Sequence, residues 1–339
     1  MVRFISWASL ALGLLVAYGS GWAYRAEGRF ERNPSVGTPV RLTVENPHGA
    51  VRVRRGGPGR VHVVGHVTIR AFSRKQAQSW LQRILTDPPV IQADGDIRIE
   101  WPAWARRSWS VFGGPWGLRV DYTIDVPPET NVRVKTGSGD VEVRDVDGPV
   151  WVHTLSGDVE VQTVQSAVEV RTGSGDVRVE EVRGDVEVRA GSGDVRLGST
   201  IGRVTVRLGS GDLTADRVQG PVEASTGSGD IALTRVVGDV QVRAGSGDIR
   251  VRTYQTPTDR TWELATGSGE IEVALPETAR FEVNARTRAG RVTVEFPLTT
   301  VWVQDRWQVR GIVGSADLRV EARAGSGSIR IRRVPLATD

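Results

Sequence analysis

The sequence repeats the tetrapeptide Gly-Ser-Gly-Asp at a constant step of 18 residues. The copies begin at Gly137, Gly173, Gly191, Gly209, Gly227 and Gly245, and Leu155-Ser156-Gly157-Asp158 fills the remaining place. A looser copy begins at Gly267, 22 residues after Gly245. A fixed period of this size indicates a solenoid, in which each repeat is one structural unit that stacks on its neighbours.

The smaller unit inside this period has nine residues, a glycine followed by a small or acidic residue and then alternating apolar and polar residues. Val141 and Val143 lie on one side of such a segment and Glu142 and Arg144 on the other, as in a strand. Two units form one coil with two strands. One corner is a bare Gly-Ser-Gly-Asp turn, and the other is closed by an additional apolar residue: Val146, Val164, Val182, Val218 or Val236.

These patterns predict an all-β fold, a parallel β-solenoid formed as a two-sheet roll of 18-residue coils. A right-handed winding is expected because parallel crossovers strongly favour it. Besides the strands, we expect an N-terminal apolar helix and one short amphipathic helix. The regular nonapeptide solenoid spans residues 131–255, and irregular coils with a cap follow over 256–339.

Composition excludes several classes of site. The chain contains no cysteine, which rules out disulfides, cysteine-ligated zinc and a cysteine nucleophile. The net charge is +4, and only Lys75 and Lys135 are lysines, so 44 − 2 = 42 of the basic residues are arginine. These arginines alternate with Val and Glu along predicted strands. We therefore expect solvated strand faces and no nucleic-acid partner.

The N-terminus carries an uncharged apolar run over residues 4–23. About 20 helical residues are enough to cross a bilayer. Residues 1–23 are therefore interpreted as a signal peptide or a transmembrane signal anchor, with Gly21-Trp22-Ala23 as a cleavage site after Ala23. The expected location is the cell membrane, single-pass with an extracytoplasmic solenoid, or the periplasm or exterior if the segment is cleaved. Residues 24–36 are highly charged and are expected to form a linker.

N-terminal solenoid coils are predicted over residues 37–130, interrupted by one helix over 73–86. Ser73 is the expected N-cap, Asp87-Pro88-Pro89 ends the helix, and apolar residues share one helical face: Ala77, Trp80, Leu81, Ile84 and Leu85. Because an open solenoid end exposes core and unpaired backbone, an amphipathic helix there would act as a cover.

Several motifs resemble a known family. Asn46-Pro47-His48-Gly49 before a strand, and Ile124-Asp-Val-Pro-Pro leading to the first Gly-Ser-Gly-Asp, are similar to bacterial β-strand-repeat proteins of unknown function (DUF4097-like) that often carry an adhesin label. Leu275-Pro276 and Phe296-Pro297 resemble the C-terminal pattern of that family. The resemblance covers roughly residues 37–334. It implies a β-solenoid exposed outside the cell membrane and no established catalysis; the Trp-rich segment departs from the pattern.

An acidic row is the first candidate site, because an aspartate occupies the same place in successive coils. Adjacent carboxylates repel one another, by about 1 kcal/mol at 4 Å in water. Backbone N–H groups of the turn, an arginine row (Arg171, Arg189, Arg207 and Arg243) or a divalent cation could neutralise them. We predict a structural turn role and no metal or cofactor. Calcium is the alternative, with the ligands Asp140, Asp158, Asp176, Asp194, Asp212, Asp230 and Asp248.

A tryptophan-rich loop over residues 101–116 is the second candidate. Its tryptophans and arginines suit a bilayer interface or a sugar ring, and the alternative is a hydrophobic cap over the solenoid. The candidate contact residues are Trp101, Trp104, Arg106, Arg107, Trp109 and Trp116. The four histidines are expected to be solvated strand or turn residues: His48, His62, His66 and His153.

The sequence thus favours a non-enzymatic extracytoplasmic β-solenoid that acts as a structural or adhesin-like interaction surface at the bacterial envelope. The expected partner is an envelope protein or glycan, with the membrane contacted through the N-terminal segment. One alternative is a carbohydrate- or lipid-contacting module that uses the Trp-rich loop. A second is a polysaccharide-active enzyme with its site in the irregular C-terminal coils, since regular coils with short corners leave no room for a walled site.

Overall fold

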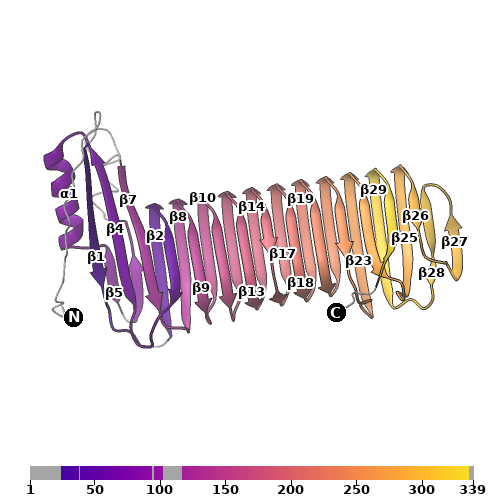
Figure 1. Cartoon of the computed structure of the whole chain (residues 1–339), viewed down its shortest axis with the longest axis horizontal. Coiled ribbons are helices and arrows are strands. Elements are labelled where there is room, and N and C mark those ends of the chain that lie inside the picture. The colour runs from indigo at the N-terminus through magenta and orange to yellow at the C-terminus, as the bar shows by residue number, and fades with distance from the viewer. Residues whose placement is uncertain (1–23, 38, 94, 102–116, 336–339) are drawn as a thin grey trace. The chain divides into compact units, whose positions relative to one another are not determined.

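The computed structural model describes residues 24–37, 39–93, 95–101 and 117–335. The chain divides into two compact units, Met1–Glu160 and Val161–Asp339. The described residues are almost entirely β-structure with one helix, which confirms the predicted all-β solenoid class (Figure 1). The predicted apolar helix within residues 1–23 lies outside the described residues, and the direction of winding stays a prediction.

The described residues of the first unit form ten complete strands and one helix. In chain order they are β1 (Tyr24–Arg32), β2 (Val40–His48), β3 (Val51–Arg55), β4 (His62–Ala71), α1 (Arg74–Thr86), β5 (Val90–Ala93), β6 (Asp96–Ile99), β7 (Gly117–Val126), β8 (Thr130–Ser138), β9 (Val141–Val146) and β10 (Val150–Ser156).

These strands form two sheets. One has the order β5-β6-β2-β8-β10 and the other β1-β4-β7-β3-β9. Pairing is parallel from β6 to β10 and from β7 through β3 to β9, as a solenoid requires. By contrast β1, β4 and β7 pair antiparallel. The Gly-rich turn after β3 reverses the chain, so β4 runs against its neighbours, and the N-terminal coils depart from a purely parallel array.

Strand β1 corrects the expectation that residues 24–36 form a linker. Residues Tyr24–Arg32 pair along their whole length with β4. Ala26 and Phe30 are buried, and Phe30 packs edge-on against Tyr122 with 6.2 Å between ring centroids. The charged residues occupy the alternate positions that face away from the core. The alternation is therefore that of a strand, although charge dominates the composition.

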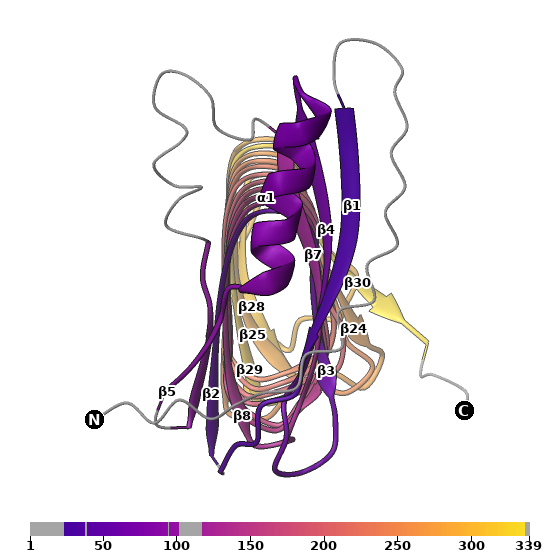
Figure 2. The same cartoon turned by 90° about the vertical axis from the view of Figure 1, so that its left-hand side faces the viewer.

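Helix α1 lies across the end of the first unit, between its two sheets (Figure 2). Ala77, Leu81 and Ile84 are buried, and Ser73 occupies the N-cap position without a side-chain hydrogen bond. A Cβ placed on Gly28 would lie 3.0 Å from Leu81 Cδ1, so β1 and the helix pack closely. The helix predicted over 73–86 thus forms and covers apolar core.

The second unit contains the regular coils and the irregular C-terminal coils. Strand β11 (Val159–Val164) includes the point of division, and the remaining strands are β12 (Val168–Ser174), β13 (Val177–Arg183), β14 (Val186–Ser192), β15 (Val195–Leu197), β16 (Thr200–Ile201), β17 (Val204–Ser210), β18 (Leu213–Gln219), β19 (Val222–Ser228), β20 (Ile231–Val237), β21 (Val240–Ser246), β22 (Ile249–Arg252), β23 (Arg260–Ser268), β24 (Ile271–Pro276), β25 (Phe281–Ala289), β26 (Val292–Val294), β27 (Thr300–Gln304), β28 (Gln308–Val313), β29 (Leu318–Ser326) and β30 (Ile329–Val334).

Two sheets again enclose the core of this unit. The β14 sheet has the order β12-β14-β17-β19-β21-β23-β29-β25-β28-β27, and the β18 sheet runs from β13 through β15, β18, β20, β22, β24 and β30 to β26. Val168 opposes Val186, and Val186 opposes Val204, so the parallel register equals the 18-residue sequence period. The inward valines of β12, β14 and β17 are at most 2% exposed.

The apolar corners of the coils behave as predicted. Val182, Val218 and Val236 are buried in the second unit. The residue before each of them, Glu181, Arg217 and Arg235, has a φ of 55–57°. This left-handed conformation is uncommon for non-glycine residues. It turns the chain so that the following valine faces the core.

Candidate functional site

The acidic row is bound by the backbone of the adjacent coil. Asp212 Oδ1 accepts the Asp230 N–H at 2.8 Å, and Asp230 Oδ1 accepts the Asp248 N–H at 2.8 Å. The same bond joins Asp158 to Asp140 in the first unit, and Asp194 to Asp176, Asp212 to Asp194 and Glu270 to Asp248 in the second. Each carboxylate therefore connects its coil to the next one through a turn amide, which is the predicted structural role.

The arginines that neutralise this row differ from the predicted ones. Arg250 contacts both Asp230 and Asp248, at 3.0 and 2.5 Å, and Arg196 lies between Asp176 and Asp194. These arginines follow the turn instead of preceding it. The predicted arginines pair with glutamates on the sheet face: Arg171 with Glu169, Arg189 with Glu187, Arg207 with Glu223 and Arg243 with Glu263.

The calcium alternative stays a prediction. Within the described parts of the chain, no group of three or more acidic or histidine side chains has the geometry to hold a metal ion. One oxygen of each carboxylate in these pairs already accepts an N–H. The row therefore acts through hydrogen bonds and arginine contacts.

We predict that the acidic row makes the solenoid acid-labile. The Asp248 N–H, and to a smaller degree Arg250, hold the pKa of Asp230 below its ordinary 3.8. A carboxyl group with a lowered folded-state pKa stabilises the fold above its unfolded-state pKa. That contribution disappears as the pH falls through the folded-state value. Thermal unfolding of wild type should therefore shift to lower temperature below pH 3.8.

The variant Asp230→Ala should cost about 1 kcal/mol at neutral pH, because one hydrogen bond to a charged but solvated acceptor is lost. Its melting temperature should also change less on acidification than that of wild type. Asp216→Asn is the matched control, since among the described residues Asp216 contacts Arg217 and Arg235 and receives no backbone N–H. If acidification lowered the melting temperature of Asp230→Ala as much as that of wild type, the prediction would be contradicted.

Of the Trp-rich loop candidates, only Trp101 is described. Its side chain is 8% exposed and lies edge-on to His48, with ring centroids 6.4 Å apart. Trp101 is thus part of a packed surface, as in the cap interpretation. The other candidates lie outside the described residues: Trp104, Arg106, Arg107, Trp109 and Trp116.

The histidines differ in their surroundings. His66 is exposed, as expected. His62 instead bridges two carboxylates, with Nε2 3.0 Å from Glu31 and Nδ1 3.1 Å from Asp125. Arg54 and His62 lower the pKa of Asp125 against the opposing effect of burial. This cluster joins β1, β4, β7 and β3, and we interpret it as structural because its contacts are made within the fold.

A groove on the outer face of the β14 sheet is a site that sequence analysis did not find. It has a volume of about 520 Å³ and crosses β21, β23, β29 and β25. Its floor consists of small residues, among them Ala265, Gly267 and Gly325. In the register of the sheet, Ala265 lies between Arg243 and Arg323, where an arginine would continue the row. Because alanine replaces a long arginine side chain at this position, the surface is lower there and the groove forms.

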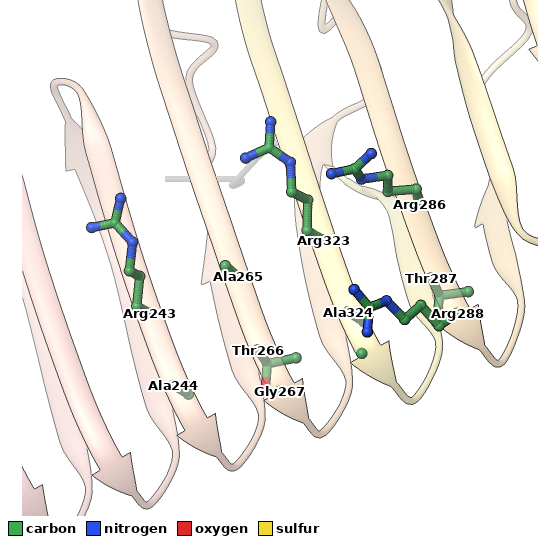
Figure 3. A pocket seen from close by; sticks show the side chains of 11 residues that line it. Arg243, Ala244, Ala265, Thr266, Gly267, Arg286, Thr287, Arg288, Arg323 and Ala324 are labelled. Carbon is green, nitrogen blue, oxygen red and sulfur yellow. The ribbon is translucent and has the colours of Figure 1, made fainter.

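Four arginines surround this floor: Arg243, Arg286, Arg288 and Arg323 (Figure 3). Arg286 and Arg288 extend from β25 toward β29 in Figure 3. We call these four residues with their floor the arginine groove. Guanidinium groups offer several fixed N–H donors and bind carboxylate, sulfate and phosphate in a bidentate manner.

The charges in the arginine groove are only partly balanced. Arg323 pairs with Glu321 at 2.9 Å, and Arg243 lies 3.9 Å from Glu263. Arg286 and Arg288 form no ion pair with any residue that the structure describes. The reason is local, because Asn284 on β25 opposes Glu321 on β29 and holds the place where most coils have a glutamate or glutamine. Two guanidinium groups are therefore available for an external anion.

The comparison with family models gives a match to Toastrack DUF4097 over residues 89–220 and 185–332. Together these two overlapping matches cover well over half of the chain. The chain belongs to the Toastrack DUF4097 family. This confirms the resemblance noted from the turn motifs. The comparison with curated proteins gives no match.

The solved structures that are similar to the chain include three from different bacteria. A candidate cell adhesion protein from Clostridium sporogenes shares 12% identity, with a TM-score of 0.23 and coverage of 90% of this chain and 100% of the other. A candidate adhesin from Bacteroides fragilis shares 14%, with a TM-score of 0.36 and coverage of 90% and 97%. A candidate lipid binding protein from Parabacteroides distasonis shares 13%, with a TM-score of 0.30 and coverage of 90% and 96%.

Proposed function

We propose that the protein is a non-enzymatic interaction surface on the extracytoplasmic side of a bacterial envelope, and that the arginine groove contacts an anionic envelope glycan. The observation that carries this proposal is the pair Arg286 and Arg288, which have no acidic partner among the described residues and border a floor of small side chains. An open groove that crosses four strands suits a polymer better than a small enclosed ligand.

The lining of the groove also bears on the enzyme alternative. It contains arginine, threonine, alanine and glycine, and neither a carboxylate nor an imidazole. Polysaccharide hydrolysis needs a pair of carboxyl groups beside the scissile bond. Glu321 and Glu263 lie outside this lining and pair with Arg323 and Arg243, so the arginine groove is better suited to holding an anionic chain than to cleaving it. Binding without turnover is the function that we assign to it.

Membrane attachment through residues 4–23 is the second part of the proposal. The apolar run is long enough for one span, and a tether there would place the groove at the envelope. Within the described residues, no helix combines the length and apolar character needed to cross a bilayer. The alternative of a carbohydrate- or lipid-contacting module based on the Trp-rich loop stays a prediction.

The test compares the binding of full-length protein to dextran sulfate and to uncharged dextran. We expect binding to dextran sulfate only, weakening as salt is added because exposed charges are screened. Arg286→Gln together with Arg288→Gln should lower the affinity about thirtyfold or more, since each of the two lost bonds to a charged group is worth about 1 kcal/mol or more.

Arg171→Gln with Arg189→Gln is the matched control. It removes the same charge from the same face, but from arginines that already pair with Glu169 and Glu187. An equal loss of affinity in both double variants would show attraction by net charge alone. That outcome would contradict a role for the groove.

A further inference from the structure

The C-terminal hairpin exposes an unusual concentration of large apolar side chains. β27 is the edge strand of the β14 sheet and pairs antiparallel with β28 (Figure 1). All five of its residues are exposed. In and beside it, Val301 is 50%, Trp302 49%, Val303 36% and Trp307 52% exposed. Large apolar side chains clustered on a surface mark an interaction site more often than single ones do.

These side chains occupy both faces of the strand. Val303 opposes Arg310, which is exposed on the outer face of the sheet, whereas Val301 opposes the buried Gly311. A protein partner that covered one face would leave the other in water. A lipid interface surrounds an inserted edge from every side, and tryptophan is enriched at that depth of the bilayer.

The local charge is complementary to an anionic membrane. Arg306 is exposed at the tip of the hairpin, and the Arg310 guanidinium lies 5.0 Å from the centre of the Trp302 ring. Asp305 is the only acidic residue between 300 and 313. Its Oδ1 accepts the N–H groups of Trp307 and Gln308, both at 2.7 Å. The acid therefore shapes the turn, while the arginines stay available for lipid phosphates.

Backbone hydrogen bonds within the protein fix the position of the hairpin without any partner. The Trp307 carbonyl accepts the Thr287 N–H at 2.8 Å, and the Arg306 carbonyl accepts the Val292 N–H at 2.9 Å. These bonds connect the tip to β25 and to the start of β26. A preformed apolar edge loses little conformational freedom on binding, which leaves more of the burial energy for affinity.

A second copy of the chain is the main competing occupant, since edge strands can pair with each other. The register of β27 shifts between Val301 and Val303, and Trp302 is the extra residue of this bulge. Bulges bend an edge strand and hinder regular pairing with another strand. The irregular edge, the exposure on both faces and the arginines favour a lipid membrane over a second copy of the chain as the occupant of this surface.

We propose that the β27–β28 hairpin inserts into the interface of an anionic lipid bilayer, with Trp302 and Trp307 as apolar anchors and Arg306 and Arg310 contacting lipid phosphates. This site is separate from the arginine groove, and the proposal does not depend on glycan binding. It gives the protein a second membrane contact besides the predicted N-terminal segment.

Hydrogen exchange on the full-length protein tests this inference while allowing for the N-terminal segment. The protein is first incorporated into phosphatidylcholine vesicles, which accommodate the N-terminal segment. A second set of vesicles is then added, made either of phosphatidylcholine alone or of phosphatidylcholine and phosphatidylglycerol in equal parts. We expect slower exchange of residues 300–310 only with phosphatidylglycerol. Equal exchange in both mixtures would overturn the proposal. So would slowing that depends on protein concentration without added vesicles, because it would indicate pairing between copies.

Trp302→Ser and Trp307→Ser should each lower the affinity for phosphatidylglycerol vesicles about tenfold, in proportion to the apolar surface that each tryptophan buries. Trp151→Ser is the matched control. Trp151 also stacks with an arginine, Arg133, at 5.2 Å, on a sheet face of the first unit. Circular dichroism verifies that all three variants are folded. If Trp151→Ser lowers the affinity as much as the hairpin variants, the hairpin is not the anchor and the proposal is wrong.

Discussion

Replacing Gly211 with alanine should destabilise the solenoid by about 4 kcal/mol or more, at the upper end of the range for single substitutions. Gly211 has a φ of +116°, and a Cβ there would lie 2.2 Å from the carbonyl oxygen of Gly193 in the preceding coil. Neither backbone can move away without breaking the hydrogen bonds between coils. The melting temperature by circular dichroism and proteolytic cleavage near residue 211 should report the loss.

Gly57→Ala is the control for this substitution. Gly57 is exposed, and a Cβ there would meet no atom within 4 Å. Its replacement should change stability by less than about 0.5 kcal/mol, as surface substitutions usually do. Equal stability of Gly211→Ala and Gly57→Ala would show that the coils can separate locally. In that case the close stacking of the turns would not be what requires glycine.

Trp262→Ala should cost about 3–5 kcal/mol, as for other large-to-small substitutions in protein cores. Trp262 is fully buried, and its Nε1–H donates to the Gly238 carbonyl at 3.0 Å. It stands in line with Val240 of the neighbouring strand, where the regular coils carry valine. Because the indole is buried and hydrogen-bonded, its truncation leaves a cavity and an unsatisfied carbonyl. Chemical denaturation measures the change in the free energy of unfolding.

Trp262→Phe separates the two contributions to this loss. It keeps most of the ring and removes the N–H, so about 1–3 kcal/mol of the loss should remain through the unsatisfied carbonyl. The exposed Trp302→Ala is the control and should leave stability nearly unchanged. A loss on Trp302→Ala as large as that on Trp262→Ala would contradict the assignment of Trp262 as a core residue and of Trp302 as a surface residue.

The regular coils were predictable because their register equals the sequence period. Residues 18 apart are direct neighbours in the sheets, so Val186 lies opposite Val204 as the repeat requires. Strand β1 was not predicted, because Arg25, Glu27, Arg29 and Glu31 made the segment look like a solvated linker. The signal was the alternation itself, with Ala26 and Phe30 on the buried face.

The arginine groove could not be predicted from a repeat, because it joins strands that are distant in the sequence. Arg286 lies beside Arg323 on adjacent strands, although 37 residues separate them. A weaker signal was present in β25, which carries Asn284 before Arg286 where several coils carry glutamate. The unpaired charge was therefore visible in the sequence, whereas its position beside the other arginines required the strand order.

That strand order also constrains how the molecule is made. In the β14 sheet, β29 lies between β23 and β25, and in the β18 sheet β30 lies between β24 and β26. The coil formed by β29 and β30 is thus inserted between two coils that precede it in the sequence. While the chain is synthesised from its N-terminal end, residues 281–294 lack their parallel neighbours until residues 318–334 follow. The regular coils can form progressively as the chain is synthesised, whereas the parallel pairing at this end depends on contacts between strands that are distant in the sequence.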